Sequence, residues 1–216
     1  MLWLLLWCGV MAEPVRPDSV IKLPSPDTTG IVSVEQALWH RRSVRTYADA
    51  PLTVKQVGQL LWAAQGRNRG PIGRTAPSAG ATYPMELYLV AGKVTGLKPG
   101  LYRYRTDGHA LALMKGGDLR SELAIAALGQ GSISSAPAVL VLAAVYSRTA
   151  RRYGERTQRY VHMEAGHIGE NVHLQCETIG LGTVMIGAYE DGRVKDLLGI
   201  KEDPLYIMPV GCKVTK

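Results

Sequence analysis

The chain has 216 residues and a formal net charge of +7, with 46% hydrophobic and 20% charged residues, which are the length and composition of one ordinary globular domain with a sizeable core. Its basic residues are scattered rather than interleaved with aromatic ones, and neither a zinc-ligand spacing nor an RNA-binding signature is present, so nucleic-acid binding is not indicated. The positive charge instead suits a small anionic ligand.

The first 30 residues differ in composition from the rest, and we expect them to form an apolar leader followed by a Pro-rich linker. Residues 1–12 are almost wholly apolar but too few for a stable membrane span, which takes about 20 residues. Val10-Met11-Ala12 fits the cleavage site of an export signal, although no basic residue precedes the apolar run. An export signal, a misplaced start codon and an apolar tail packed on the protein all suit this segment. The compartment is therefore left open between the cytoplasm and the periplasm.

Residues 31–216 are expected to form one domain in which helices and strands alternate. Capping boxes, Ser33 with Gln36 and Thr53 with Gln56, open the first two helices. In chain order we expect a helix from Ser33 to a basic run at 41–45, a helix from Thr53 to about Gly66, a loop over 68–82, strands over 85–92, 101–105 and 110–114, a helix over 118–128, a strand over 138–145, a helix over 153–179, a strand over 183–186, a helix over 191–198 and a strand over 205–210. This mixture, with two hairpin-like segments, predicts the α+β class, a sheet with helices packed on it.

The helix expected over 153–179 is the longest, and it carries two stripes at helical spacing. The apolar stripe consists of Val161, Ala165, Ile168, Val172 and Ile179, and the polar stripe of Tyr160, Glu164, His167 and Asn171. Gly166 and Gly169 each weaken a helix by about 1 kcal/mol relative to Ala, so we expect them to permit close approach of a helix or a ligand.

Two Glu-x-x-His pairs on this helix, Glu164 with His167 and Glu170 with His173, have the spacing found in di-iron carboxylate bundles. In those bundles the pairs come from different helices and further helices add carboxylates. Here both pairs lie on one helix and partly on different faces. Hydrogen-bonded helix side chains explain them better, and no metal site is predicted.

The basic run contains Arg41, Arg42, Ser43 and Arg45 within five positions. Guanidiniums packed this closely repel one another, and each offers a planar fork of donors that suits the oxygens of a phosphate. The Ser43 hydroxyl adds a donor and an acceptor for a sugar or ribityl hydroxyl. The alternative is a solvated basic helix end, which the helix dipole also favours.

Two loops have small residues that would let the backbone approach a ligand closely. Pro77-Ser78-Ala79-Gly80 precedes a strand, and its N–H groups suit a flat or anionic ligand, although a tight entry loop would look the same. Ile186-Gly187-Ala188 leaves room for the edge of a ring at the glycine, which alone is a weak signal. The sequence contains no nucleophile elbow, Walker loop or dinucleotide fingerprint, so hydrolase and nucleotidase functions lack their machinery.

Several blocks of sequence, taken together, identify a family. In chain order they are SVEQALWHRRSVRTY, LTVKQVGQLLWAAQG, RTAPSAGATYPMELYLV, GLYRY, RYVHMEAGHIGENVHLQCETIGLGTVMIGAYED and PLYIMPVG. They resemble the nitroreductase family over residues 33–211, most closely its SagB-type branch, which includes azoline dehydrogenases of peptide-toxin biosynthesis. The resemblance implies a nitroreductase-like α+β fold with a mixed, mostly antiparallel sheet flanked by helices and a long central helix at a homodimer interface. It also implies one FMN at each of two sites formed across that interface.

The resemblance assigns roles to individual residues of this chain. The FMN contacts it implies are Arg41, Arg42, Ser43 and Arg45 on phosphate and ribityl, Pro77, Ser78, Ala79 and Gly80 beneath the flavin, Ile186, Gly187 and Ala188 facing the ring near its reactive nitrogen, and Gly211 and Lys213 closing over the phosphate. These assignments agree with the chemistry of the residues, because cations suit a phosphate and small residues suit a flat ring. Tyr160 is the candidate proton donor, and packing at the interface is its alternative role.

The chain departs from the family pattern at two places. Many nitroreductases have an Asn and Gln-Pro-Trp after the Ser loop, where this chain has Gly80, Ala81 and Tyr83-Pro84, and this favours the SagB-type branch. Azoline dehydrogenases tend to carry a Lys-Tyr pair where this chain has Arg at position 159, and Arg is a poor general base.

We therefore expect an FMN-dependent oxidoreductase that passes hydride from NAD(P)H or an organic donor to a small-molecule acceptor, such as a nitro compound or a quinone, by a ping-pong mechanism. One alternative is a SagB-type dehydrogenase that oxidises an azoline or a similar heterocycle. The other is a protein that binds the flavin without NAD(P)H turnover, or an enzyme that consumes the flavin itself.

Overall fold

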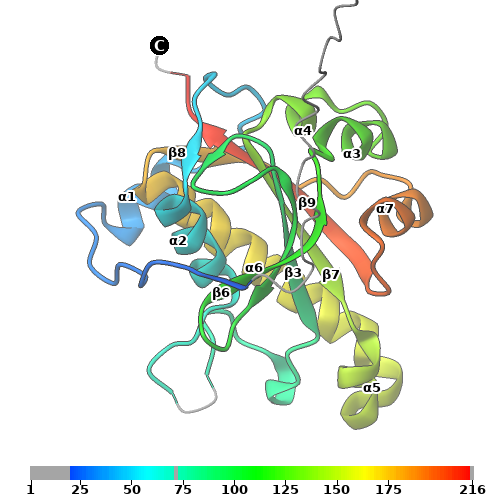
Figure 1. The fold of residues 1–216 in the computed structure, drawn as a ribbon. Helices are drawn as coiled ribbons and strands as arrows, with labels where there is room; N and C mark the ends of the chain where they lie inside the picture. The colour runs from blue at the N-terminus through cyan, green and yellow to red at the C-terminus, as the bar shows by residue number, and fades with distance from the viewer. Residues whose placement is uncertain (1–19, 71–72, 215–216) are drawn as a thin grey trace, which may run out of the picture.

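The computed structural model describes residues 20–70 and 73–214 (Figure 1). The apolar leader expected over residues 1–12 and the start of the Pro-rich segment lie outside these ranges. No helix within them is long and apolar enough to cross a membrane.

A seven-stranded sheet forms the centre of the fold, and each pair of neighbouring strands in it is antiparallel. A smaller sheet is a parallel pair, β2 (Leu52–Thr53) with β4 (Val94–Thr95). The order in the large sheet is β1-β6-β5-β3-β7-β9-β8. Its strands are β1 (Val20–Lys22), β3 (Met85–Ala91), β5 (Gly100–Arg105), β6 (Ala110–Gly116), β7 (Ala138–Ala144), β8 (Leu181–Thr183) and β9 (Asp203–Cys212). The expected mixed, mostly antiparallel arrangement is confirmed.

Helices cover both faces of this sheet. In the described ranges they are α1 (Val34–His40), α2 (Val54–Gln65), α3 (Arg120–Ala126), α4 (Gly131–Ser135), α5 (Tyr146–Tyr153), α6 (Thr157–Thr178) and α7 (Asp191–Leu198), with 3-10 turns at Ala79–Ala81 and Gly154–Arg156. The capping boxes at Ser33 and Thr53 are both formed, which confirms the predicted starts of α1 and α2. The predicted ends also hold, since Arg41 caps α1 and Gly66 caps α2.

The core has one apolar layer on each side of the sheet. Successive side chains of β3 point alternately into the two layers. Leu87 and Leu89 belong to the layer under α2 and α6, whereas Tyr88 and Val90 belong to the layer under α3, α4 and α7. Figure 1 shows α6 running along one side of the strands, with α3, α4 and α7 grouped on the other. Every residue of β7 is buried, as its continuous apolar run predicts.

The predicted apolar stripe of the long helix is the side that α6 turns to the sheet. Val161, Ala165, Ile168 and Val172 are each at most 1% exposed, and burial of a Val or Ile side chain contributes about 1.5–3 kcal/mol. Gly169 permits close approach of Met185 rather than of another helix, because a Cβ there would lie 2.1 Å from the Met185 sulfur.

Several boundaries differ from the expectations, two of them near the candidate site. The long helix begins at Thr157 rather than at position 153, because Gly154 takes a φ of +50° and separates α6 from α5, a helix that the sequence pattern did not predict. The strand expected over 183–186 is instead β8, at 181–183. Beyond it the chain leaves the ladder, and only Ile186 pairs again with β9.

The segment expected to be a linker also contains a strand, because β1 pairs with β6 at the edge of the sheet. The chain continues to pack on the domain after β1. Leu23 is buried, and its N–H donates to the carbonyl of His109 at 2.9 Å. The Asp27 N–H donates to the side chain of Gln59 at 2.8 Å. Residues 20–27 are therefore held by the domain rather than extending away from it.

Candidate functional site

The basic run is held against the C-terminal edge of the sheet by backbone contacts. The Val44 N–H donates to the Thr183 carbonyl at 2.9 Å. A Cβ added at Gly182 would lie 2.7 Å from the Val44 Cβ, and one added at Gly211 would lie 2.7 Å from Cγ of Tyr47. A larger residue at either position would force the neighbouring chain to shift. The two glycines thus allow the run to lie directly on β8 and β9.

Two cations of the candidate site are oriented by glutamates of α6. Arg41 Nε lies 3.5 Å from Glu170 Oε1, and the Lys213 ammonium pairs with the Glu177 carboxylate. These two glutamates are two helical turns apart and face the same side of the helix, about 10 Å from each other. Arg42, Ser43 and Arg45 are exposed, and neither Arg42 nor Arg45 makes an ion pair with the described residues. Their donors are therefore available to a ligand.

The loop that begins at Pro77 has a strained backbone. Gly80, Ala81 and Tyr83 have φ values of +58°, +53° and +43°, a region that residues with a side chain seldom adopt. Ser78 Oγ accepts a hydrogen bond from the Tyr83 N–H at 2.9 Å, which closes the loop on itself. Such strain persists only where surrounding contacts over-determine the conformation.

Those contacts come from a buried polar network around Glu164, which is 2% exposed. Gln65 Nε2 donates to its carboxylate at 3.0 Å, and the Ser78 side chain lies close enough to lower the pKa of Glu164. Gln65 Oε1 accepts from Arg74 Nη1 at 2.5 Å, and the Arg74 guanidinium lies 4.3 Å from the ring centroid of Tyr83. The network therefore starts and ends on the loop, and it ties the loop to α2 and α6. Burial raises the pKa of Glu164, against the opposing effect of the Ser78 and Gln65 side chains.

Tyr160 lies one turn before Glu164 on α6 and close to the same loop. Its ring makes an edge contact with the ring of Tyr153, with centroids 4.8 Å apart. A Cβ at Gly80 would lie 2.6 Å from the Tyr153 hydroxyl, so Tyr153 separates Tyr160 from the loop backbone. This position suits both roles considered for Tyr160, proton donor and packing residue.

The segment Ile186-Gly187-Ala188 is fixed at both ends and open in the middle. Ile186 and Ile207 exchange two backbone hydrogen bonds of 2.9 Å, and the Ala188 carbonyl accepts from the Gln130 side chain at 2.8 Å. Gly187 is exposed, and a Cβ there would meet no atom closer than one of Tyr206 at 4.0 Å. The backbone of this segment is therefore accessible to a flat group.

Helix α6 links these groups, but one chain does not bring all of them together. Glu164 holds the Ser78 loop and Glu170 holds Arg41, and the rise between the two glutamates is about 9 Å. No hydrogen bond or ion pair joins the Ser78 loop to the basic run within residues 20–70 and 73–214. The basic run, Gly211 and Lys213 do converge, at the edge formed by β8 and β9.

The two Glu-x-x-His pairs do not converge on one point. Glu164 accepts a hydrogen bond from Gln65, Glu170 pairs with Arg41, and His167 is exposed. His173 is buried. Burial lowers its pKa to about 4, and the positive charge of the nearby Arg41 adds to this effect. No group of three His, Cys, Asp or Glu residues in the described ranges could hold a metal ion.

Comparison with known proteins decides the family. The model of the Nitroreductase family matches residues 38–212, which is most of the chain. The chain belongs to the nitroreductase family. The fold class, and the sequence blocks that carry the resemblance, are thereby confirmed. Nitroreductases are typically FMN-dependent, in agreement with the expected cofactor, and they commonly act as dimers with NAD(P)H.

Individual relatives agree with this membership. A proposed nitroreductase of Methanocaldococcus jannaschii is 45% identical over 183 residues, which cover 85% of this chain and 92% of that protein. A solved structure of a proposed nitroreductase from Ralstonia eutropha JMP134 is similar with a TM-score of 0.79 and 32% identity, over 93% of this chain and 95% of that one. A trifolitoxin operon protein of Rhizobium leguminosarum bv. trifolii is 26% identical, over 87% of this chain and 57% of that protein.

Sequence reasoning missed the polar network behind the Ser78 loop. Glu164 was assigned to a polar helix stripe, and Gln65 and Arg74 were given no role. One signal was present in the sequence, because Gln65 is a polar residue at the end of the otherwise apolar face of the second helix. Buried polar side chains of this kind require partners, but the pattern alone does not say which.

Proposed function

We propose that this nitroreductase uses FMN to pass hydride from NAD(P)H or an organic donor to a small-molecule acceptor, such as a nitro compound or a quinone, by ping-pong exchange in one pocket. Residues 31–216 would form the FMN-binding domain, with the segment from residue 20 packed on it. The observation that carries this proposal is the basic run. Gly182 and Gly211 let it lie on β8 and β9, and it presents Arg42, Ser43 and Arg45 without partners among the described residues.

The chemistry of the exposed groups fits FMN. Arg41, Arg42, Ser43 and Arg45 would hold the phosphate and ribityl, with Gly211 and Lys213 beside them. Pro77, Ser78, Ala79 and Gly80 would lie beneath the ring, and the backbone of Ile186, Gly187 and Ala188 would face its edge. The flavin supplies the redox chemistry when bound. The chain contributes orientation of the reactants and backbone donors for charge that develops on the ring.

Tyr160 is our candidate for a group that gives a proton to the acceptor. It lies on α6 near the Ser78 loop, next to Tyr153. Its phenolic hydroxyl carries a proton that it can donate, so it would act by donating rather than by accepting a proton. The edge contact with Tyr153 supports the alternative role as a packing residue equally well.

We further propose that the active form is a homodimer with α6 at its interface. Helix α1 packs on α6 and has an exposed apolar face. Its exposed side chains, with Ile31 before the helix, are Ile31 at 101%, Val34 at 65%, Leu38 at 53% and Trp39 at 85%. An apolar face of this kind next to a site indicates a protein interface. A second copy placed there would supply a Ser78 loop to the basic run, which one chain does not do.

The SagB-type alternative is favoured by one comparison and opposed by one residue. The similarity to a trifolitoxin operon protein supports the SagB-type branch, which includes enzymes of peptide-toxin biosynthesis. Arg159 opposes azoline oxidation, because a guanidinium stays protonated in proteins and does not serve as a base.

Steady-state kinetics of the FMN-loaded protein test the proposal. NADH and NADPH would each be varied against menadione and a nitroaromatic acceptor. Ping-pong exchange predicts parallel lines in double-reciprocal plots. Bound flavin that no nicotinamide reduces would instead support the azoline dehydrogenase or the flavin-binding protein without turnover.

A further inference from the structure

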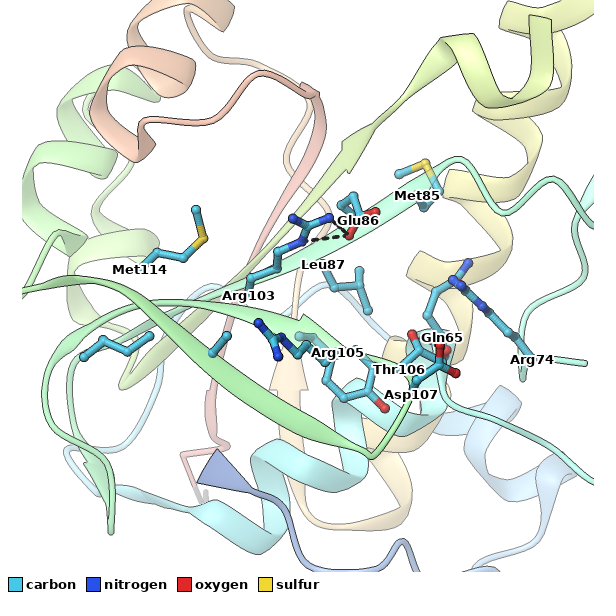
Figure 2. A pocket seen from close by; sticks show the side chains of 13 residues that line it. Gln65, Arg74, Met85, Glu86, Leu87, Arg103, Arg105, Thr106, Asp107 and Met114 are labelled. Carbon is cyan, nitrogen blue, oxygen red and sulfur yellow. Dashed lines mark hydrogen bonds and ion pairs between the residues drawn. The ribbon is translucent and has the colours of Figure 1, made fainter. Parts of the chain in front are cut away.

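A cavity of about 680 Å³ lies beside the β5–β6 turn (Figure 2). It is lined by residues of β3, β5 and β6 together with Gln65 and Arg74. This volume is within the range of small-molecule sites. None of the residues assigned above to FMN lines it.

Most of the charge in this cavity is already balanced. Arg103 Nη2 lies 2.9 Å from Glu86 Oε2, and Arg148 Nη2 lies 2.5 Å from Glu86 Oε1. Figure 2 shows the first of these pairs across the cavity floor. Asp107 pairs with Arg67 at 2.7 Å. The acidic groups of the cavity are thus engaged by arginines, and they would not repel an anionic ligand strongly.

Two arginines of the lining, Arg74 and Arg105, have no carboxylate partner among the described residues. Arg74 is the more buried of the two, and its donors are only partly satisfied. Its Nη1 donates only to the neutral amide of Gln65, and its buried Nε has no hydrogen-bond partner in the described part of the chain. Burial lowers the pKa of Arg74. The carboxylates of Glu86 and Glu164 act on Arg74 from a distance, but neither forms an ion pair with it. A ligand carboxylate in direct contact would recover free energy that burial of the cation costs.

One end of the cavity is apolar. Among its apolar lining residues Met85, Leu87 and Leu113 are at most 6% exposed, whereas Met114 is 38% exposed, and Figure 2 shows Met114 and Arg74 toward opposite ends of the cavity. A molecule with a charged group at one end and hydrocarbon at the other would contact both kinds of surface. The planar fork of Arg matches a carboxylate, with which it forms paired hydrogen bonds.

We propose that this cavity is a second binding site, which takes an organic monocarboxylate with an apolar body. Arg74 anchors the carboxylate, and Arg105 adds longer-range attraction. Because Arg74 stacks on Tyr83 and binds Gln65, the ligand lies directly behind the network that holds the Ser78 loop. The site is distinct from the flavin site, and its existence does not depend on the redox activity.

Calorimetric titration of the full chain, with and without saturating FMN, tests this site. The probes are 4-phenylbutanoate and its uncharged match 4-phenylbutanamide. We expect saturable binding of the acid, binding of the amide about tenfold weaker or less, and the same acid affinity in both flavin states. Equal binding of acid and amide, no binding of the acid at millimolar concentration, or displacement of the acid by FMN would each overturn the proposal.

Variants locate the carboxylate. Arg74→Gln should weaken binding of the acid about tenfold and leave binding of the amide unchanged. Arg74→Lys should recover only part of the lost affinity, because Lys lacks the planar pair of donors of a guanidinium. Arg105 lies outside the network around Glu164, and Arg105→Gln should weaken binding of the acid by about two- to threefold. Arg193→Gln, on α7, is the matched control and should change nothing. Acid affinity unaffected by both Arg74→Gln and Arg105→Gln would contradict the assignment.

Discussion

Glu170 and Glu177 lie two turns apart on one side of α6, and each pairs with a cation from a different end of the chain, Arg41 and Lys213. The long helix therefore orients both cations at the edge of β8 and β9. The same carboxylates also place negative charge beside the proposed phosphate position. This relationship makes flavin affinity sensitive to α6 as well as to the basic run.

Replacement of Glu177 with Gln should tighten FMN binding by about two- to fivefold, because it removes a carboxylate that competes with the phosphate for Lys213. Lys213→Met should have the opposite effect and weaken FMN binding about tenfold. Fluorescence titration of apoprotein with FMN measures both. Glu122→Gln, at an exposed position of α3, is the control. Weaker FMN binding by Glu177→Gln would show that the glutamate acts mainly by positioning Lys213.

A methyl group at Gly211 should displace the basic run. The added Cβ would lie 2.7 Å from Cγ of Tyr47, and overpacking of this kind costs about 1–3 kcal/mol. For a domain of this size, Gly211→Ala should lower Tm by about 3–10 °C and weaken FMN as well. Gly192→Ala on α7 meets no atom within 4 Å, and it should leave both Tm and FMN affinity unchanged or raise Tm slightly. Unchanged Tm and FMN affinity in Gly211→Ala would refute the close contact.

Stability should fall on acidification through the titration of His173. Burial lowers the pKa of this side chain from 6.5 to about 4, so the unfolded chain binds a proton at higher pH than the folded one. Above pH 6.5 His173 is neutral in both states and does not reduce the free energy of unfolding. As the pH falls toward 4, protonation of His173 in the unfolded chain lowers the free energy of unfolding by up to about 3 kcal/mol. His173→Met should flatten the free energy of unfolding over this window in urea titrations. His40→Met, at an exposed helix end, should retain the parent slope, and an equal flattening there would contradict the assignment.

The apolar face of α1 should be required for dimer formation and for flavin binding together. Trp39→Glu places a charge at a side chain that is 85% exposed in one chain, so it should not unfold the monomer. Analytical ultracentrifugation should show monomers, and FMN affinity should fall at least about tenfold because the partner's Ser78 loop is lost. Ile125→Glu on α3, at a side chain 57% exposed, should stay dimeric. A Trp39→Glu monomer that binds FMN normally would exclude a shared site.

The sequence predicted elements whose signals are local and missed those that depend on distant contacts. The capping boxes at Ser33 and Thr53 identified two helix starts because cap and partner lie three residues apart. Helix α5 was not predicted, and the long helix was placed four residues too early, because the φ of +50° at Gly154 that separates the two helices leaves no signal in the hydrophobic pattern. Strand β1 was missed because its partner β6 lies about 90 positions away in sequence.

The candidate site shows the same division. The basic run was recognisable because its charges are contiguous, whereas its place on Gly182 and Gly211 depends on contacts between segments that are far apart in the sequence. The network from Ser78 through Glu164 and Gln65 was not predictable, because it joins three segments that no spacing rule connects. The roles of the predicted FMN contacts stay predictions.

The central claim is that the basic run binds the phosphate of a flavin, and it is tested most directly by comparing FMN with riboflavin, which lacks only that phosphate. The parent protein should bind FMN at least about a hundredfold more tightly than riboflavin. The double variant Arg42→Ala, Arg45→Ala should lose most of this difference while its riboflavin affinity stays the same. Equal affinities of the parent for the two flavins, or a full preference for FMN in the double variant, would contradict the account.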